Sequence, residues 1–201
     1  MHRRMQARAT GQRKVARKLD QILVIDVEAT CWQGAPPEGQ ESEIIEIGIC
    51  RLDVASGEPM SKHSILVRPE NSRISEFCTQ LTTLTHKQVL KKGVTFEKAC
   101  RMLERDFQSK KRLWASFGDY DRSLFERQCE AHSVPYPFSG GHINVKSLFG
   151  VMQALPYEVG MTRALEMLEL ELEGIHHRGV DDAYNVARIL SKLLLNKRAC
   201  S

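Results

Sequence analysis

The chain has 201 residues, 42% of them hydrophobic and 27% charged, with a net charge of +4; this is the composition of a soluble protein with one full-sized core. No apolar run is long enough to cross a bilayer, and none follows the basic start as a secretory signal requires, so we expect no membrane association. The six cysteines form no C-x-x-C pair, which excludes the usual zinc and disulfide frameworks and favours a reducing, cytoplasmic location.

The basic charge is concentrated at the start of the chain. Residues 1–18 carry seven of the 29 Lys and Arg residues and no acid, so the rest carries 22 basic against 25 acidic side chains. We expect residues 1–20 to be a solvated, flexible tail, followed by a single domain over residues 21–197. Two alternatives remain open: an arm that attracts nucleic-acid phosphates, and an organellar transit segment, which the lack of serine disfavours.

Three strands are predicted at the start of the domain. They are Gln21–Val27, Glu43–Val54 and His63–Val67, each rich in β-branched residues. The Gly- and Pro-rich segment Thr30–Glu41 separates the first two as a loop. Strands that follow one another at short distances predict an antiparallel meander.

Helices and strands then alternate. Helical periodicity covers Ile74–Leu81, Thr85–Leu90, Thr95–Phe107, Asp121–His132, Met161–Leu170 and Asp181–Leu195. Strands are expected at Arg112–Phe117 and Ile143–Val145, the second with a helix after it. A meander followed by alternating elements predicts an α/β fold with a mixed sheet.

Two carboxylates end the first predicted strand. Asp26 and Glu28 are two residues apart and therefore point to the same face. Burying two like charges together is costly unless a cation compensates, and oxygen ligands without cysteine or histidine favour Mg²⁺ or Mn²⁺. An isolated D-x-E pattern is common, however, and can also end a strand in solvent.

Further acidic residues stand where helices begin. Asp119 and Asp121 follow the predicted strand 112–117, and Asp182 opens the last helix. A single Asp at such a position can be an N-cap. His177 and Gly179 just before Asp182 indicate more than a helix cap, because histidine is the side chain best suited to accept a proton near neutral pH.

The order of these motifs resembles the DEDDh 3′→5′ exonuclease superfamily: D-x-E, then Y-D before a helix, then H-x-x-x-x-D at the last helix. The segments Val24–Trp32, Ile74–Thr85 and His177–Ala187 resemble one branch of it. That branch contains the three-prime histone-mRNA exonuclease, the enhanced-RNAi nuclease and bacterial relatives described as inhibitors of a sporulation-kinase pathway. The resemblance covers residues 21–195.

The resemblance implies a ribonuclease H-like fold, a mixed sheet flanked by helices, and an activity. The enzyme would release nucleoside 5′-monophosphates from single-stranded nucleic acid, with RNA favoured. Two divalent cations, Mg²⁺ or Mn²⁺, would be held by Asp26, Glu28, Asp121 and Asp182, and His177 would be the general base. The His-to-Asp spacing favours His177 and Asp182 over His176 and Asp181, and Asp121 is preferred to Asp119 because it follows the aromatic Tyr120.

The resemblance also implies a place for the 3′-terminal nucleotide. The backbone at Ala29 and Thr30 would face the terminal sugar, Phe77 and Leu81 would sandwich the base, and Tyr120 would line the site. Phe77 and Leu81 are one helical turn apart and form one apolar patch, on which any base can stack. Their spacing fits core residues equally well.

Two rival functions remain. One is a DNA-directed 3′→5′ exonuclease, because the motif residues do not distinguish ribose from deoxyribose. The other is a catalytically silent, nucleic-acid-binding regulator with the same fold, against which the presence of all five catalytic residue types argues.

Overall fold

A computed structural model describes residues 16–199, with the side chains of 196–199 left out. The predicted basic tail, residues 1–20, therefore falls largely outside the described part. Its last residues belong to the first strand, which begins at Lys18 and not at Gln21. No helix within the described range has the length and apolarity needed to cross a membrane.

A five-stranded mixed sheet forms the centre of the molecule, in the order β3-β2-β1-β4-β5. Its strands are β1 (Lys18–Ala29), β2 (Ile44–Asp53), β3 (Pro59–Leu66), β4 (Arg112–Ser116) and β5 (His142–Asn144). The first three pair antiparallel, whereas β4 and β5 run parallel to β1. The predicted meander and α/β mixed sheet are thus confirmed.

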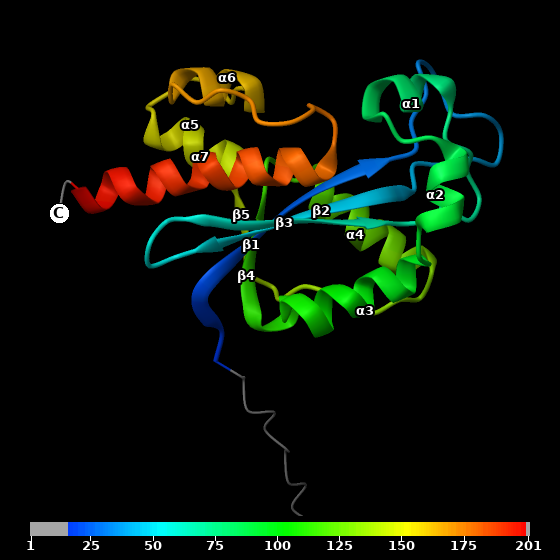
Figure 1. Ribbon diagram of the computed structural model, residues 1–201, viewed down its shortest axis with the longest axis horizontal. Helices are drawn as coiled ribbons and strands as arrows, with labels where there is room; N and C mark the ends of the chain where they lie inside the picture. Colours follow the sequence, from blue (N-terminus) through cyan, green and yellow to red (C-terminus); the bar gives the residue numbers. More distant parts are fainter. Residues whose placement is uncertain (1–15, 200–201) are drawn as a thin grey trace, which may run out of the picture.

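Helices cover both faces of this sheet (Figure 1). They are α1 (Glu76–Thr82), α2 (His86–Lys92), α3 (Phe96–Phe107), α4 (Tyr120–Ala131), α5 (Val145–Met152), α6 (Met161–Met167) and α7 (Gly179–Ala199). Helices α5, α6 and α7 lie on one face and α3 and α4 on the other, while α1 and α2 stand at one end of the sheet. Every predicted helix is present, with bounds that differ by a few residues.

The alternation of side chains along β1 divides the core into two layers. Leu23 and Ile25 pack against the α3–α4 side, and Ile22 and Val24 pack against the α5–α7 side. Asp26 continues the second set, because residues two apart on a strand share a face. The acidic end of β1 therefore faces the helical layer that contains α7.

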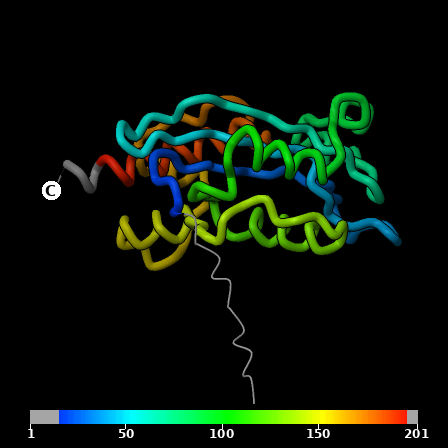
Figure 2. Tube along the Cα trace, turned by 90° about the horizontal axis from the view of Figure 1, so that it is seen from below, coloured from blue at the N-terminus to red at the C-terminus, as the bar shows by residue number. Residues whose placement is uncertain are grey.

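The β2–β3 hairpin is longer than predicted, because β3 begins at Pro59 and not at His63. The N–H of Asp53 donates to the carbonyl of Glu58 (3.0 Å), and Gly57 turns the chain with a φ of +75°. Figure 2 shows this hairpin, in cyan, along one long side of the molecule. Ser191 of α7 donates to the carbonyl of Gly57 (2.5 Å), which fixes the long helix against the turn.

The five cysteines within residues 16–199 are free thiols, four of them buried. The buried thiols act as small apolar side chains of the core.

Candidate active site

The acidic residues singled out in the sequence meet in one cavity of about 290 Å³. Asp26 and Glu28 come from the end of β1, Asp121 from the first turn of α4, and Asp182 from the first turn of α7. The remaining lining residues are Val27, Phe117, Tyr120, Met161, His176 and His177. The structure thus brings together all five residues predicted to be catalytic, from three elements far apart in the sequence.

Burial and mutual repulsion destabilise the charged forms of these carboxylates. Burial, followed by the charges of Asp121 and Glu28, holds the pKa of Asp26 well above its ordinary value. Burial and then the charge of Asp182 raise the pKa of Glu28 to about 8. Burial also raises the pKa of Asp121 to about 6 and raises the pKa of Asp182. A bound cation would reverse this cost by compensating the negative charge.

The arrangement fits a divalent metal ion. Carboxylate oxygens of Asp26, Glu28 and Asp182 lie within 4.8 Å of one another. Asp121 is held beside them, because its Oδ1 accepts a hydrogen bond from the N–H of Val27 at 2.9 Å. A set of oxygen ligands of this kind suits hard cations such as Mg²⁺ or Mn²⁺.

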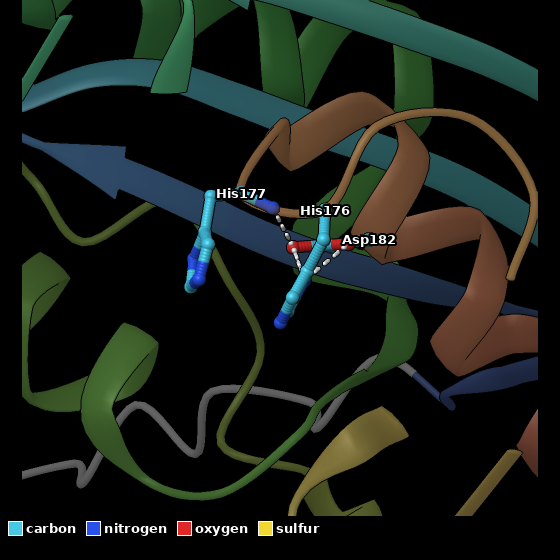
Figure 3. A group of neighbouring side chains, drawn as sticks. All are labelled: His176, His177 and Asp182. Atoms are coloured by element: carbon cyan, nitrogen blue, oxygen red, sulfur yellow. Dashed lines mark hydrogen bonds and ion pairs between the residues drawn. The ribbon is translucent and has the colours of Figure 1, made fainter. Parts of the chain in front are cut away.

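Two histidines stand next to Asp182, as Figure 3 shows. The Nδ1 of His176 lies 3.1 Å from Oδ2 of Asp182, and the backbone N–H of His177 donates to the same oxygen at 2.9 Å. The two imidazoles are stacked, with centroids 3.9 Å apart. His177 has a φ of +64°, a left-handed conformation that is uncommon for a residue with a side chain.

The surroundings of His177 favour its neutral form. Burial, and then the neighbouring His176, lower its pKa, whereas Asp182 raises it. A neutral imidazole can accept a proton, so the side chain suits the predicted role of a base. The sequence spacing favoured His177 over His176 as the base. In the structure, His176 lines the same cavity and contacts Asp182. The only sign of this in the sequence is that the two histidines are adjacent.

The predicted base-binding residues are more exposed than core residues. Phe77 is 37% exposed and Tyr120 is 59% exposed, and Leu81 is partly buried. Neither Phe77 nor Leu81 belongs to the hydrophobic clusters found within residues 16–199. The alternative that Phe77 is an ordinary core residue therefore has no support in the packing, and its contact with a base stays a prediction.

The segment after β1 is held by hydrogen bonds between side chains and the backbone. Thr30 is fully buried; its hydroxyl donates to the carbonyl of Glu41 (3.0 Å) and accepts from the N–H of Glu43 (2.9 Å). The carbonyl of Ala29 accepts from Sγ of Cys78 on α1 at 3.4 Å. The side chain of Thr30 thus shapes the loop, and the predicted contact of this backbone with a terminal sugar is left as a prediction.

Comparisons with known proteins all match the chain to exonucleases. Residues 23–190 match the family described as exonuclease. Human 3′-5′ exoribonuclease 1 is 34% identical over 186 residues, which are 87% of this chain and 52% of that protein. The probable 3′-5′ exonuclease KapD of Bacillus subtilis is 27% identical, over 88% of this chain and 86% of its own length.

Solved structures give the same grouping. The nuclease domain of 3′hExo, a DEDDh family member bound to rAMP, superimposes with a TM-score of 0.81 at 31% identity, covering 90% of this chain and 95% of that one. The chain spans about half the length of the mammalian relatives that it matches.

Proposed function

Because the chain belongs to the exonuclease family, in its DEDDh branch, we propose that it is a metal-dependent 3′→5′ exonuclease that removes nucleoside 5′-monophosphates from single-stranded RNA. The observation that carries this proposal is the cavity in which Asp26, Glu28, Asp121 and Asp182 surround one space beside His177. Buried carboxylates with raised pKa values have no evident structural purpose there, whereas a phosphodiesterase that uses cations needs them.

The carboxylates would hold two divalent cations. Such ions, when bound, stabilise the attacking and leaving oxygens of an in-line displacement at phosphorus. Asp121 is oriented for this role by the N–H of Val27, and Asp182 by the N–H of His177. These bonds fix both side chains before substrate arrives.

His177 would act as the general base. Its imidazole takes a proton from the attacking water as the water oxygen bonds to phosphorus, and the bond from phosphorus to the 3′ oxygen of the preceding nucleotide breaks. That oxygen gains a proton and becomes the new 3′ hydroxyl. The lowered pKa of His177 keeps the imidazole free to accept the proton at neutral pH.

RNA is the favoured substrate because of two solved structures that are more than 30% identical to the chain. One is bound to rAMP, at 31% identity, and another concerns 3′-end recognition of a histone mRNA stem-loop, at 32%. Two similar structures that contain DNA are 20% and 12% identical and show only the fold. The exposed ring of Phe77 offers a stacking surface that any single-stranded base could use.

Digestion of 5′-labelled single-stranded oligomers tests the proposal. With Mg²⁺ or Mn²⁺, we expect a one-nucleotide ladder from the 3′ end of RNA that EDTA and Asp26→Asn abolish. His177→Ala should lower kcat by about 10²–10⁴-fold, as loss of a general base does. Arg101→Gln is the matched control, since it removes an exposed ion pair with Glu97 on α3.

The same assay separates the rivals. A ladder on the matched DNA but not on RNA would establish a DNA-directed enzyme. No degradation of either by metal-loaded protein would refute the enzyme and leave a nucleic-acid-binding regulator.

A further inference from the structure

A fifth acidic residue lies beside the cavity, and both of its carboxylate oxygens accept hydrogen bonds. Glu46 is fully buried on β2, directly opposite Glu28 in the strand register. Its Oε1 accepts from the hydroxyl of Ser64 (2.5 Å), and its Oε2 accepts from the N–H of Gly179 (3.0 Å). The guanidinium of Arg178 donates to both oxygens, from Nε at 3.1 Å and from a terminal nitrogen at 3.0 Å.

The partners of Glu46 are the residues that place the active-site histidine. Arg178 follows His177 directly, and Gly179 begins α7. The guanidinium also donates to the hydroxyl of Thr83 at 3.3 Å, and Thr83 ends α1, the helix that carries Phe77. One buried carboxylate thus joins β2, the segment around His177, the start of α7 and, through Arg178, the end of α1.

Close backbone packing shows how tightly α7 is seated. A Cβ atom on Gly48 would lie 1.8 Å from the carbonyl oxygen of Gly179, and one on Gly179 would lie 3.0 Å from the carbonyl oxygen of Asp26. Two glycines therefore let the first turn of α7 press onto the strands at the level of Asp26. Contact this close tolerates only one position of the turn that carries Asp182.

We propose that Glu46 and Arg178 form a clamp that positions His177 and Asp182 for catalysis; this inference rests on the proposed function. A bidentate pair of Arg with a carboxylate fixes direction as well as distance. It would hold the uncommon backbone conformation of His177, which has a φ of +64°. Neither clamp residue touches substrate in this proposal, so both act through the residues they hold.

Arg178→Lys is the decisive variant. Lysine keeps the positive charge but cannot form the fork to Glu46 and reach Thr83 at once. If the clamp positions His177, kcat on single-stranded RNA should fall about 10–100-fold, the usual effect of losing a supporting partner, with KM almost unchanged. If Arg178 only attracts RNA phosphates, Arg178→Lys will keep kcat and Arg178→Gln will raise KM alone, which would overturn the proposal.

Glu46→Gln tests the other half of the pair. In a double-variant cycle with Arg178→Gln, the double variant should lose no more kcat than the worse single variant, because both substitutions break one interaction. Additive losses would overturn the clamp. Arg101→Gln, on a distant face, is the control, and thermal melting confirms that each variant is folded.

Amide hydrogen exchange makes the clamp testable without activity. Protection over residues 176–182 of the full chain should fall in Arg178→Lys and Glu46→Gln and stay unchanged in Arg101→Gln. If the unaltered chain digests no RNA, the proposed function has failed, and exchange alone decides whether the pair holds this segment. Unchanged exchange in both clamp variants would refute it.

Discussion

Two buried glutamates in the same part of the fold have opposite surroundings. Glu43 is 2% exposed, and its carboxylate accepts from the backbone N–H groups of Glu70, Asn71 and Ser72 at 2.6–3.3 Å. Glu28 is 8% exposed, and its burial, followed by the charges of the carboxylates that it faces, raises its pKa to about 8. Within residues 16–199, the fold supplies hydrogen-bond donors to the carboxylate of Glu43 and not to that of Glu28, as the proposed binding of a cation by Glu28 requires.

Replacing each glutamate by the neutral glutamine should separate the two roles, and this is the largest effect that we expect. We expect Glu28→Gln to abolish exonuclease activity without lowering the free energy of unfolding of the metal-free protein. Glu43→Gln should retain chemistry but lower that free energy by about 1–3 kcal/mol, because a donor replaces an acceptor before three N–H groups. RNA digestion and urea unfolding in EDTA measure both, each variant serving as the other's control.

The pH dependence of activity should follow a base whose pKa is lowered. His177 must be neutral to accept a proton, so kcat should be high above its pKa and fall about tenfold per pH unit below it. Because burial lowers this pKa, the fall should begin below the ordinary histidine value of about 6.5. The residual activity of His177→Ala should not show this fall at low pH. If that variant shows the same fall, the titrating group is another residue.

Phe77 resembles Glu28 in one respect: the fold leaves its side chain without a full set of partners. In Phe77 the partners that are missing are apolar. Stacking of one base is worth about 1–3 kcal/mol, so Phe77→Ala should raise KM on RNA by about 5- to 100-fold with little change in stability. Leu90→Ala, at a residue with a similar exposed fraction on α2, is the matched control. Equal KM values for both variants would remove Phe77 from the substrate site.

Stability should also depend on pH through Glu28. The folded-state pKa of Glu28, about 8, lies above the ordinary value of 4.5, so this group stabilises the fold fully below about pH 4.5. Its contribution is lost as pH rises towards 8. Metal-free protein should therefore gain stability from Glu28→Gln at pH 8 and not at pH 4.5, as thermal unfolding in EDTA would show; an equal difference at both pH values would contradict the shift.

Local patterns in the sequence predict much of this fold and the members of its candidate site. The spacing of Asp26 and Glu28 on a strand, and the placing of Asp121 and Asp182 at helix starts, are properties of short segments. Helix α3 illustrates the same point, since its predicted apolar face is buried and Thr95 caps it through the N–H of Lys98. Helical periodicity and capping depend on residues only a few positions apart, so they can be recognised in a single sequence.

Features that depend on distant partners could not be predicted in this way. The bonds of Glu46 to Arg178 and of Glu43 to residues 70–72 join segments whose approach is decided by packing of the whole domain. Within the predicted strand Glu43–Val54, nothing distinguishes these two glutamates from other polar residues of a strand. The contribution of His176 was likewise hidden, because the direction of its ring depends on where α7 places Asp182.

The contact between Gly48 and Gly179 also bears on when the candidate site forms during synthesis. The site is completed only when the last helix docks on strands made much earlier, a closure over a long loop that comes late in folding. A nascent chain that has emerged only as far as α6 lacks His177 and Asp182. The candidate site is therefore complete only when nearly the whole domain has left the ribosome.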